Sequence, residues 1–202
     1  MGEVVQLQQT GVPKKAHRFK KINPENLVTA LPVVEQISEE IDQNQIAKQV
    51  LLRRLSNAPR TRKELAQDLK KKKIEEDIAK QALDRFEELG LINDQTYSEN
   101  FVANTHERRK LGKKALKQQL RSKGVSEETA NQAVLQISDE DEFKSALALA
   151  LKKIRSIQND DPQTQIRKIV SLLARKGYSS SLSFQVAKQV IDDFPEGLTI
   201  FS

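Results

Sequence analysis

The sequence predicts an all-α protein: three tandem three-helix repeats in an elongated arrangement, preceded by a basic, partly disordered N-terminal extension. Glycine is scarce, with seven residues in 202, while Lys, Glu, Gln, Ala and Leu are abundant, and this composition favours helix over sheet. Apolar residues recur at helical spacing from Gln45 to about residue 194, as in amphipathic helices. A pattern that ends a helix also occurs three times, 51 and 53 residues apart, which is typical of a tandem triplication.

Each copy of this pattern has a leucine near a helix end, basic residues, a stop residue and then an apolar residue. The three copies are Leu69–Ile74, Leu120–Val125 and Leu173–Tyr178. The stop residue is expected to take the left-handed backbone conformation that favours glycine, and it is Gly124 and Gly177 in the later copies. Lys73 takes its place in the first copy; if it must adopt a positive φ there, the cost is roughly 1 kcal/mol relative to glycine.

The first repeat is expected to span 45–92. Its first helix ends near residues 57–59, and Thr61 with Glu64 forms a capping box at the start of the second helix. The third helix starts with two acids, Glu75 and Glu76, and ends at Gly90. The residues expected to face inward are Ile46, Val50, Leu51, Leu55, Leu65, Leu69, Ile78, Leu83, Phe86 and Leu89.

The second and third repeats are expected to span 93–137 and 138–195. Asn93 or Asp94 caps the first helix of the second repeat, and Ser138 opens that of the third. Asp161 is an N-cap followed by a proline at the first helical position. The main inward-facing residues are expected to be Tyr97, Phe101, Val102, Leu116, Leu120, Ala130, Val134, Ile137, Phe143, Leu147, Ala150, Leu151, Ile154, Ile157, Ile166, Ile169, Val170, Leu173, Val186, Val190, Ile191 and Phe194.

Residues 1–44 are predicted to form the extension and residues 196–202 a tail. The segment 13–21 holds five basic residues and no acid, and we expect about the first 20 residues to be mobile. Pro24 and Pro32 are expected to interrupt any long helix. Only a short amphipathic turn or two is expected beyond them, around Val33, Val34, Ile37 and Ile41.

The strongest candidate for a binding surface is the stretch 107–125, which carries eight basic residues and one acid, Glu107. Lys113, Lys117 and Arg121 are four residues apart and are expected to share a solvent-facing side of one helix. Charged helix faces are often only solvated, but this density of uncompensated charge favours a binding surface. We therefore predict contacts to a partner or to DNA from Arg108, Arg109, Lys110, Lys113, Lys114, Lys117, Arg121 and Lys123, supported by Lys70, Lys71, Lys72, Arg175 and Lys176.

The composition also argues against several classes of protein. A net charge of +6 and a pI near 9.4 favour polyanions or an acidic protein surface as partners. The absence of cysteine excludes disulfides and thiolate ligands, and the two histidines, His17 and His106, are expected to be solvated. The sequence has no phosphate loop, nucleophile–base pair or metal-ligand cluster, so we expect neither an enzyme nor a bound metal or cofactor. Without a signal peptide or a membrane-length apolar run, a cytoplasmic monomer is expected.

Two consecutive segments of the sequence together form a fairly specific motif. The first is Gly90–Asp94 with Tyr97; the second is the basic helix with Gly112, Leu116, Leu120 and Lys123–Val125. Further matches are Glu64, Leu65, Leu69, Phe101, Val102, Arg108, Arg109, Ala150–Lys153 and Leu173–Ser179. On these residues the chain resembles the RecX family of bacterial recombinase regulators. The likeness covers about residues 46–194.

The resemblance implies binding to the RecA recombinase and its nucleoprotein filament, and damping of recombinase activity in DNA repair, homologous recombination and the SOS response. It also implies some direct affinity for DNA. A non-catalytic modulator of the kind that the resemblance implies could act by binding one filament state better than another. One alternative is a helical protein that binds single- and double-stranded DNA weakly and non-specifically, without a recombinase partner, because lysine suits phosphates better than base edges. A generic helical-repeat scaffold is a further alternative.

Overall fold

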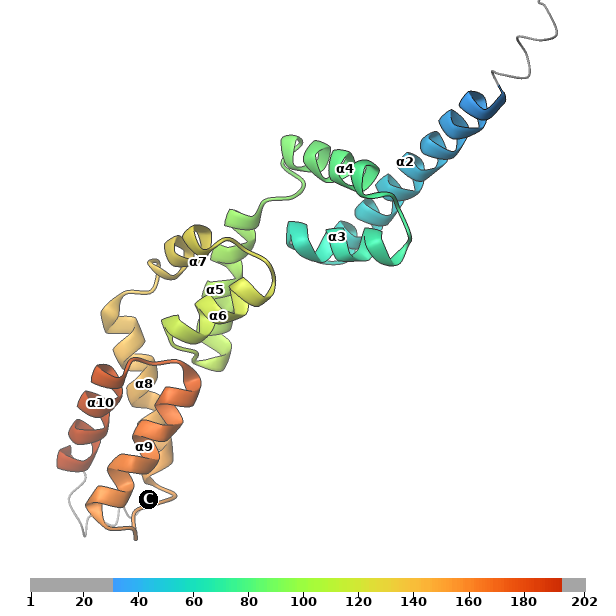
Figure 1. Cartoon of the computed structure of the whole chain (residues 1–202). Coiled ribbons are helices and arrows are strands. Elements are labelled where there is room, and N and C mark those ends of the chain that lie inside the picture. Colours follow the sequence, from blue (N-terminus) through green and yellow to red (C-terminus); the bar gives the residue numbers. More distant parts are fainter. Residues whose placement is uncertain (1–30, 194–202) are drawn as a thin grey trace, which may run out of the picture. The chain divides into compact units, whose positions relative to one another are not determined.

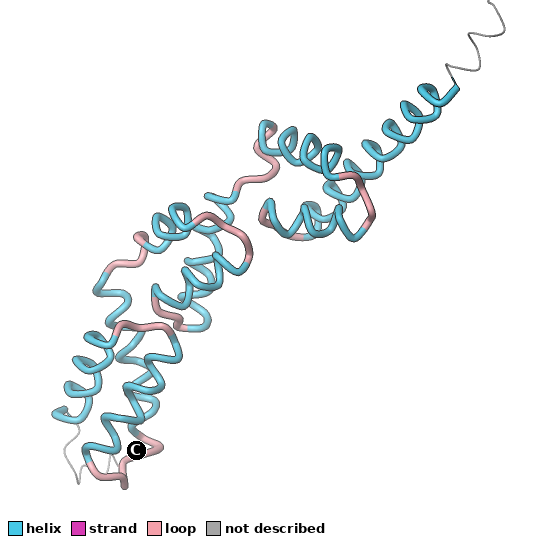
Figure 2. Tube along the Cα trace, in the orientation of Figure 1, coloured by secondary structure: helices cyan, strands magenta, loops and turns pink. Residues whose placement is uncertain are grey.

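This computed structural model describes residues 31–193 of the chain, with side chains described from residue 42. These residues form nine α-helices joined by short turns (Figure 1). No strand occurs among these residues (Figure 2), so the predicted all-α class is confirmed. The basic segment 13–21 and the tail 196–202 lie outside the described residues. The helices are α2 (Leu31–Asn57), α3 (Arg62–Lys71), α4 (Glu76–Glu88), α5 (Asp94–Arg109), α6 (Lys113–Ser122), α7 (Glu127–Val134), α8 (Asp139–Ile154), α9 (Pro162–Lys176) and α10 (Ser180–Asp193).

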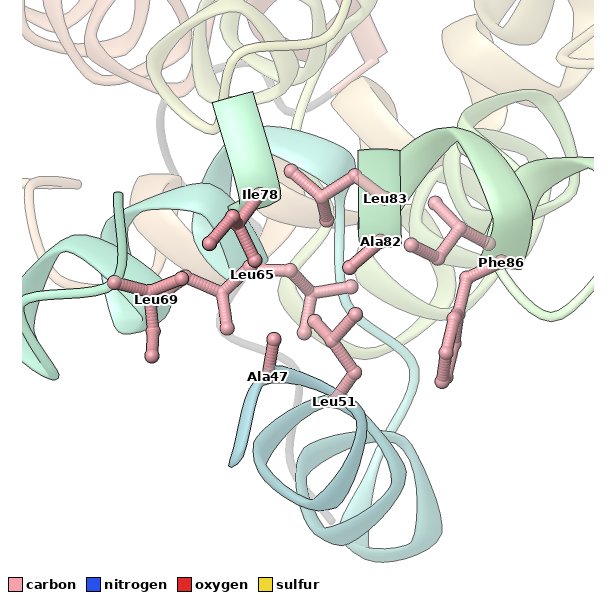
Figure 3. Close-up of a cluster of buried hydrophobic side chains, with 10 residues drawn as sticks. Ala47, Leu51, Leu65, Leu69, Ile78, Ala82, Leu83 and Phe86 are labelled. Atoms are coloured by element: carbon pink, nitrogen blue, oxygen red, sulfur yellow. The ribbon is translucent and has the colours of Figure 1, made fainter. Parts of the chain in front are cut away.

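Each successive group of three helices encloses its own apolar core. In the first, side chains of α2, α3 and α4 converge, with Leu51 and Leu65 fully buried (Figure 3). Leu116 and Leu120 occupy the core of α5–α7, and Leu173 that of α8–α10. Each such leucine contributes about 1.5–3 kcal/mol through burial. The predicted architecture of three three-helix repeats is confirmed, and we call these groups repeats 1, 2 and 3.

The first helix is much longer than predicted, since α2 begins at Leu31 and runs without a break to Asn57. Pro32 does not interrupt this helix, because it lies in the first turn, where a missing amide removes no helical hydrogen bond. The predicted border at residue 44 therefore falls inside a continuous helix.

Leu89 also differs from the prediction. It was expected to face inward, but it is 55% exposed because α4 has ended at Glu88 and the chain is already turning at Gly90.

The repeated helix-ending pattern has one geometry in all three repeats. The amides of Ile74, Val125 and Tyr178 donate to the carbonyls of Leu69, Leu120 and Leu173, at 3.3, 3.2 and 3.1 Å. Such six-residue bonds define the Schellman motif, in which the stop residue is left-handed. Its φ angle is 59° at Lys73, 89° at Gly124 and 86° at Gly177. Lys73 therefore does adopt the positive φ that glycine takes in the other two repeats.

Neighbouring repeats are joined through the ends of their second helices, α3, α6 and α9. Between repeats 1 and 2, the Thr61 hydroxyl at the start of α3 donates to the carbonyl of Lys123 at the end of α6, at 2.7 Å. Between repeats 2 and 3, the Gly112 amide at the start of α6 donates to the carbonyl of Lys176 at the end of α9, at 2.9 Å. The positive N-terminal end of one helix therefore meets the negative C-terminal end of the next.

A carboxylate from the following repeat completes each joint. The backbone amide of Arg62, the first residue of α3, donates to Asp94 Oδ1 of repeat 2 at 2.9 Å. The equivalent amide of Lys113, the first residue of α6, donates to Glu142 Oε1 of repeat 3 at 2.9 Å. Both joints thus satisfy amides that a helix cannot satisfy internally.

The stop glycines allow these close approaches. A Cβ atom on Gly177 would lie 2.3 Å from Cβ of Ala115, and one on Gly124 would lie 2.1 Å from Cδ of Lys63. A Cβ on Gly90, which also has a positive φ of 69°, would have no neighbour within 4 Å.

We expect Gly177→Ala to destabilise the protein by about 3 kcal/mol or more, because backbone strain of about 1 kcal/mol adds to the clash with Ala115. Gly90→Ala is the matched control, with the same strain but open space, and should cost only about 1 kcal/mol. Urea unfolding followed by circular dichroism measures both. Equal losses would show that close packing at Gly177 contributes nothing.

Candidate functional site

The joint between repeats 2 and 3 gathers basic residues from separate parts of the sequence. The end of α5 and the start of α6 meet the end of α9: Lys176 Nζ donates to the carbonyl of Arg109 at 3.0 Å, and the Tyr178 hydroxyl donates to the carbonyl of Lys110 at 3.0 Å. The Gly112 amide bonds the Lys176 carbonyl beside them. We call the resulting set the junction cluster: Arg108, Arg109, Lys110, Lys114, Arg175 and Lys176.

The junction cluster carries six formal positive charges. Arg108, Arg109, Lys114 and Arg175 are exposed, and Lys110 and Lys176 are half-buried. None of the six forms an ion pair with an acidic side chain among the residues whose side chains are described. Like charges gathered at one joint repel one another, so an anion that neutralises them is attracted.

Tyr178 holds the backbone of the junction cluster in place. Its ring is almost fully buried, and its hydroxyl bonds the Lys110 carbonyl. Burial, with a smaller contribution from the charge of Glu142, raises the pKa of Tyr178 far above its usual value. The phenol therefore remains a hydrogen-bond donor throughout the physiological pH range.

Lys110 has a left-handed conformation, with φ of 49°, and ends α5. A lysine in this region costs roughly 1 kcal/mol relative to glycine. The turn separates α5 from α6, so the basic stretch 107–125 does not form one helical surface.

His106 lies at the same joint and is not merely solvated, contrary to expectation. Its Nδ1 is 2.8 Å from the Leu111 carbonyl and its Nε2 is 2.9 Å from Oγ of Ser145, in repeat 3. Because a carbonyl can only accept, Nδ1 donates and, in the neutral ring, Nε2 accepts from the serine hydroxyl. No local sequence pattern indicates this bridge, since Ser145 is 39 residues away.

Within the stretch 107–125, three predicted site residues form ion pairs inside the chain. Lys113 was expected to face solvent, but its side chain is only 23% exposed and pairs with Asp139 at 2.7 Å and Glu142 at 3.7 Å, so that expectation is wrong. Arg121 is 3.7 Å from Glu127. Lys123 pairs with Glu64 of repeat 1 at 2.8 Å.

The remaining predicted residues lie apart from the joint or are less accessible. Lys117 is half-buried on α6 and forms no ion pair with any described side chain. Lys70, Lys71 and Lys72 are exposed at the C-terminal end of α3, in repeat 1. No contact brings them to the junction cluster within residues 42–193.

The Lys123 ammonium stabilises the joint between repeats 1 and 2. It lies 5.7 Å from the ring centre of Tyr97 and 5.9 Å from that of Phe101, which stack on each other. Partial burial alone would raise the pKa of Glu64, but the hydrogen bonds from Lys123 and from the Thr61 amide outweigh it and lower that pKa below its usual value.

Across residues 31–193, no helix has the length and apolar character needed to cross a membrane. Within the same residues, no group of three or more His, Asp or Glu side chains has an arrangement that could hold a metal ion.

These features define a tandem three-helix repeat protein with an exposed basic junction. Family models for the first, second and third RecX three-helix domains match residues 47–86, 93–134 and 139–186. The chain belongs to the RecX family.

Individual relatives agree with this assignment. Regulatory protein RecX of Streptomyces coelicolor is 38% identical over 147 residues, which cover 73% of this chain and 78% of that protein. The Thermobifida fusca protein of the same name is 32% identical over 155 residues, covering 74% and 84%. The crystal structure of RecX from Lactobacillus salivarius superposes with a TM-score of 0.72 at 27% identity, covering 76% of this chain and 99% of that one.

The Glu64–Lys123 pair should make the free energy of unfolding depend on pH in the acidic range. Because the pKa of Glu64 is lower in the folded state, its contribution is fully present above the ordinary carboxyl pKa and is lost as pH falls through the folded-state value. Glu64→Gln should therefore cost about 1 kcal/mol at pH 7 and almost nothing in strong acid. Urea unfolding at several pH values measures this. A loss that is independent of pH would contradict it, and Lys123→Gln in a double-mutant cycle isolates the pair.

Proposed function

We propose that this protein is a non-catalytic regulator that binds the RecA recombinase and its nucleoprotein filament and restrains recombinase activity in DNA repair and the SOS response. The RecX relatives are named as regulatory proteins, and RecA as the partner comes from the family resemblance. The observation that carries the proposal is the junction cluster, six cations without acidic partners in the described part of the chain. Acting on RecA requires a cytoplasmic location.

The joint between repeats 2 and 3 suits this role because it fixes charge on a rigid backbone. The carbonyls of Arg109 and Lys110 are held by hydrogen bonds from Lys176 and Tyr178. A surface organised before binding loses less entropy when a partner docks. Binding one filament state better than another is then sufficient to shift filament assembly, without any chemical step.

A second candidate function is non-specific DNA binding without a recombinase partner. It is favoured by the lysines of the junction cluster and of Lys70–Lys72 and by the lack of aromatic residues among them. Lysine contacts phosphates and does not by itself read bases. Comparing affinity for bare single-stranded DNA with affinity for the recombinase filament separates the two functions.

Reversing three exposed charges of the junction cluster should abolish regulation without unfolding the protein. We expect Arg108→Glu, Arg109→Glu and Lys114→Glu together to weaken inhibition of RecA-promoted strand exchange by a hundredfold or more, at about 1 kcal/mol or more per contact. Stability should change by no more than about 1 kcal/mol, because these side chains are exposed.

The matched control reverses three exposed charges elsewhere, Lys80→Glu, Arg167→Glu and Lys188→Glu, which form no ion pair among the described side chains. This control has the same net charge as the junction variant and should still inhibit. Full inhibition by the junction variant would show that the site is wrong. Equal loss in both variants would show that only net charge matters.

DNA binding should depend steeply on salt. If about five phosphates are neutralised, the logarithm of the affinity for single-stranded DNA should fall with the logarithm of salt concentration with a slope of roughly −3.5. Fluorescence anisotropy of labelled oligonucleotides of different sequence measures both this slope and the expected lack of sequence preference. A flat dependence would mean that the basic residues are simply solvated.

A further inference from the structure

Among the described residues, only two amino acids other than glycine have a positive φ angle, and both are lysines: Lys73 and Lys110. Lys110 belongs to the junction cluster. Lys73 is the stop residue of repeat 1, where the other two repeats have Gly124 and Gly177. Glycine would adopt the φ of 59° found there with less strain, so the conformation of the chain does not favour lysine at this position.

Packing does not account for this lysine either. In repeats 2 and 3 the stop glycine lies against the preceding repeat, with no room for a Cβ atom. Lys73 is exposed, and no hydrogen bond or ion pair of its side chain is found with any described residue. The site therefore tolerates a side chain, but nothing in the described structure uses the one it has.

Lys73 continues a run of cations at the C-terminal end of α3. Lys70, Lys71 and Lys72 are also exposed, and of the four only Lys71 forms an ion pair among the described side chains. That pair is weak, at 3.6 Å to Asp68, a carboxylate already bound by Arg54 at 2.9 Å. The helix dipole favours lysines in the last turn, but it does not explain a fourth cation beyond the helix in a strained conformation.

We propose that Lys70–Lys73 is a second phosphate-binding site, for the backbone of a nucleic acid, and that the lysine at position 73 contributes to it through its charge. Lysine is depleted at protein–protein interfaces and common at phosphate contacts. The run contains no aromatic or apolar residue that would dock a protein partner. Local strain at a binding residue is a known form of trade-off between stability and function. The inference rests on the salt-dependent affinity for DNA that is predicted under the proposed function.

The test is Lys73→Gly in the full-length chain, which removes strain and charge together. The urea midpoint should rise, because glycine relieves the backbone. The affinity for a fluorescent single-stranded oligonucleotide should fall about fivefold near 0.1 M salt, and the salt slope should become less negative by about 0.7, the value for one phosphate contact. Higher stability with weaker binding excludes unfolding as the cause of the loss.

Two further variants make the test specific. Lys73→Arg keeps the charge and should keep both affinity and slope near those of the wild type. Lys80→Gln removes an exposed charge on α4 and should leave the slope unchanged.

A wild-type slope in Lys73→Gly overturns this inference and leaves the proposed function intact, provided that the wild type binds DNA in a salt-dependent way. A wild type without salt-dependent binding overturns this inference and the DNA affinity on which it rests, but not binding to the recombinase. Weaker binding to a recombinase filament with unchanged binding to bare DNA would identify Lys70–Lys73 as a protein contact, and would also overturn the inference.

Discussion

The end-to-end joining of α3, α6 and α9 is the constraint on which the rest of the described structure depends. No side chain of its own caps the N-terminus of α6. The first amides of α6 donate instead to Glu142 and to the carbonyl of Gly177, both in repeat 3. Since an unpaired buried amide costs a few kcal/mol, α6 is complete only when repeat 3 is folded against it. Repeats 2 and 3 are therefore expected to fold as one cooperative unit, although each has its own core.

The same joint explains how a dense group of cations can exist at one place. Arg109 and Lys110 end α5, and Lys176 ends α9, so each lies where a helix dipole is negative and favours a positive side chain. Their backbone carbonyls are bound across the joint, so the repulsion between side chains is opposed by contacts of the main chain. The structural role of the backbone leaves the exposed charged groups available for a partner.

The sequence reveals the fold well because helical periodicity, caps and stop residues are local features. Thr61 with Glu64 forms the expected capping box, and Ser138 and Asp161 cap α8 and α9 as expected. The candidate site is less predictable from the sequence, because the ion-pair partners of two predicted basic residues lie far away along the chain. Lys113 pairs with Asp139, 26 residues away, and Lys123 with Glu64, 59 residues away. Charge density in the sequence marks a basic region, but only the folded arrangement separates cations paired within the chain, such as Lys113 and Lys123, from those without an acidic partner among the described side chains.

The first residue of each second helix determines whether a further repeat could be joined to it by the same backbone contact. Arg62 and Lys113 each offer a backbone amide to the carboxylate of the next repeat, whereas Pro162 opens α9 and has no amide to offer. At the other end of the series, the side chain of Lys73 occupies the place where a joint of this type needs bare glycine. A repeat duplicated at either end would thus meet a joint that lacks one of these backbone contacts or the space for them.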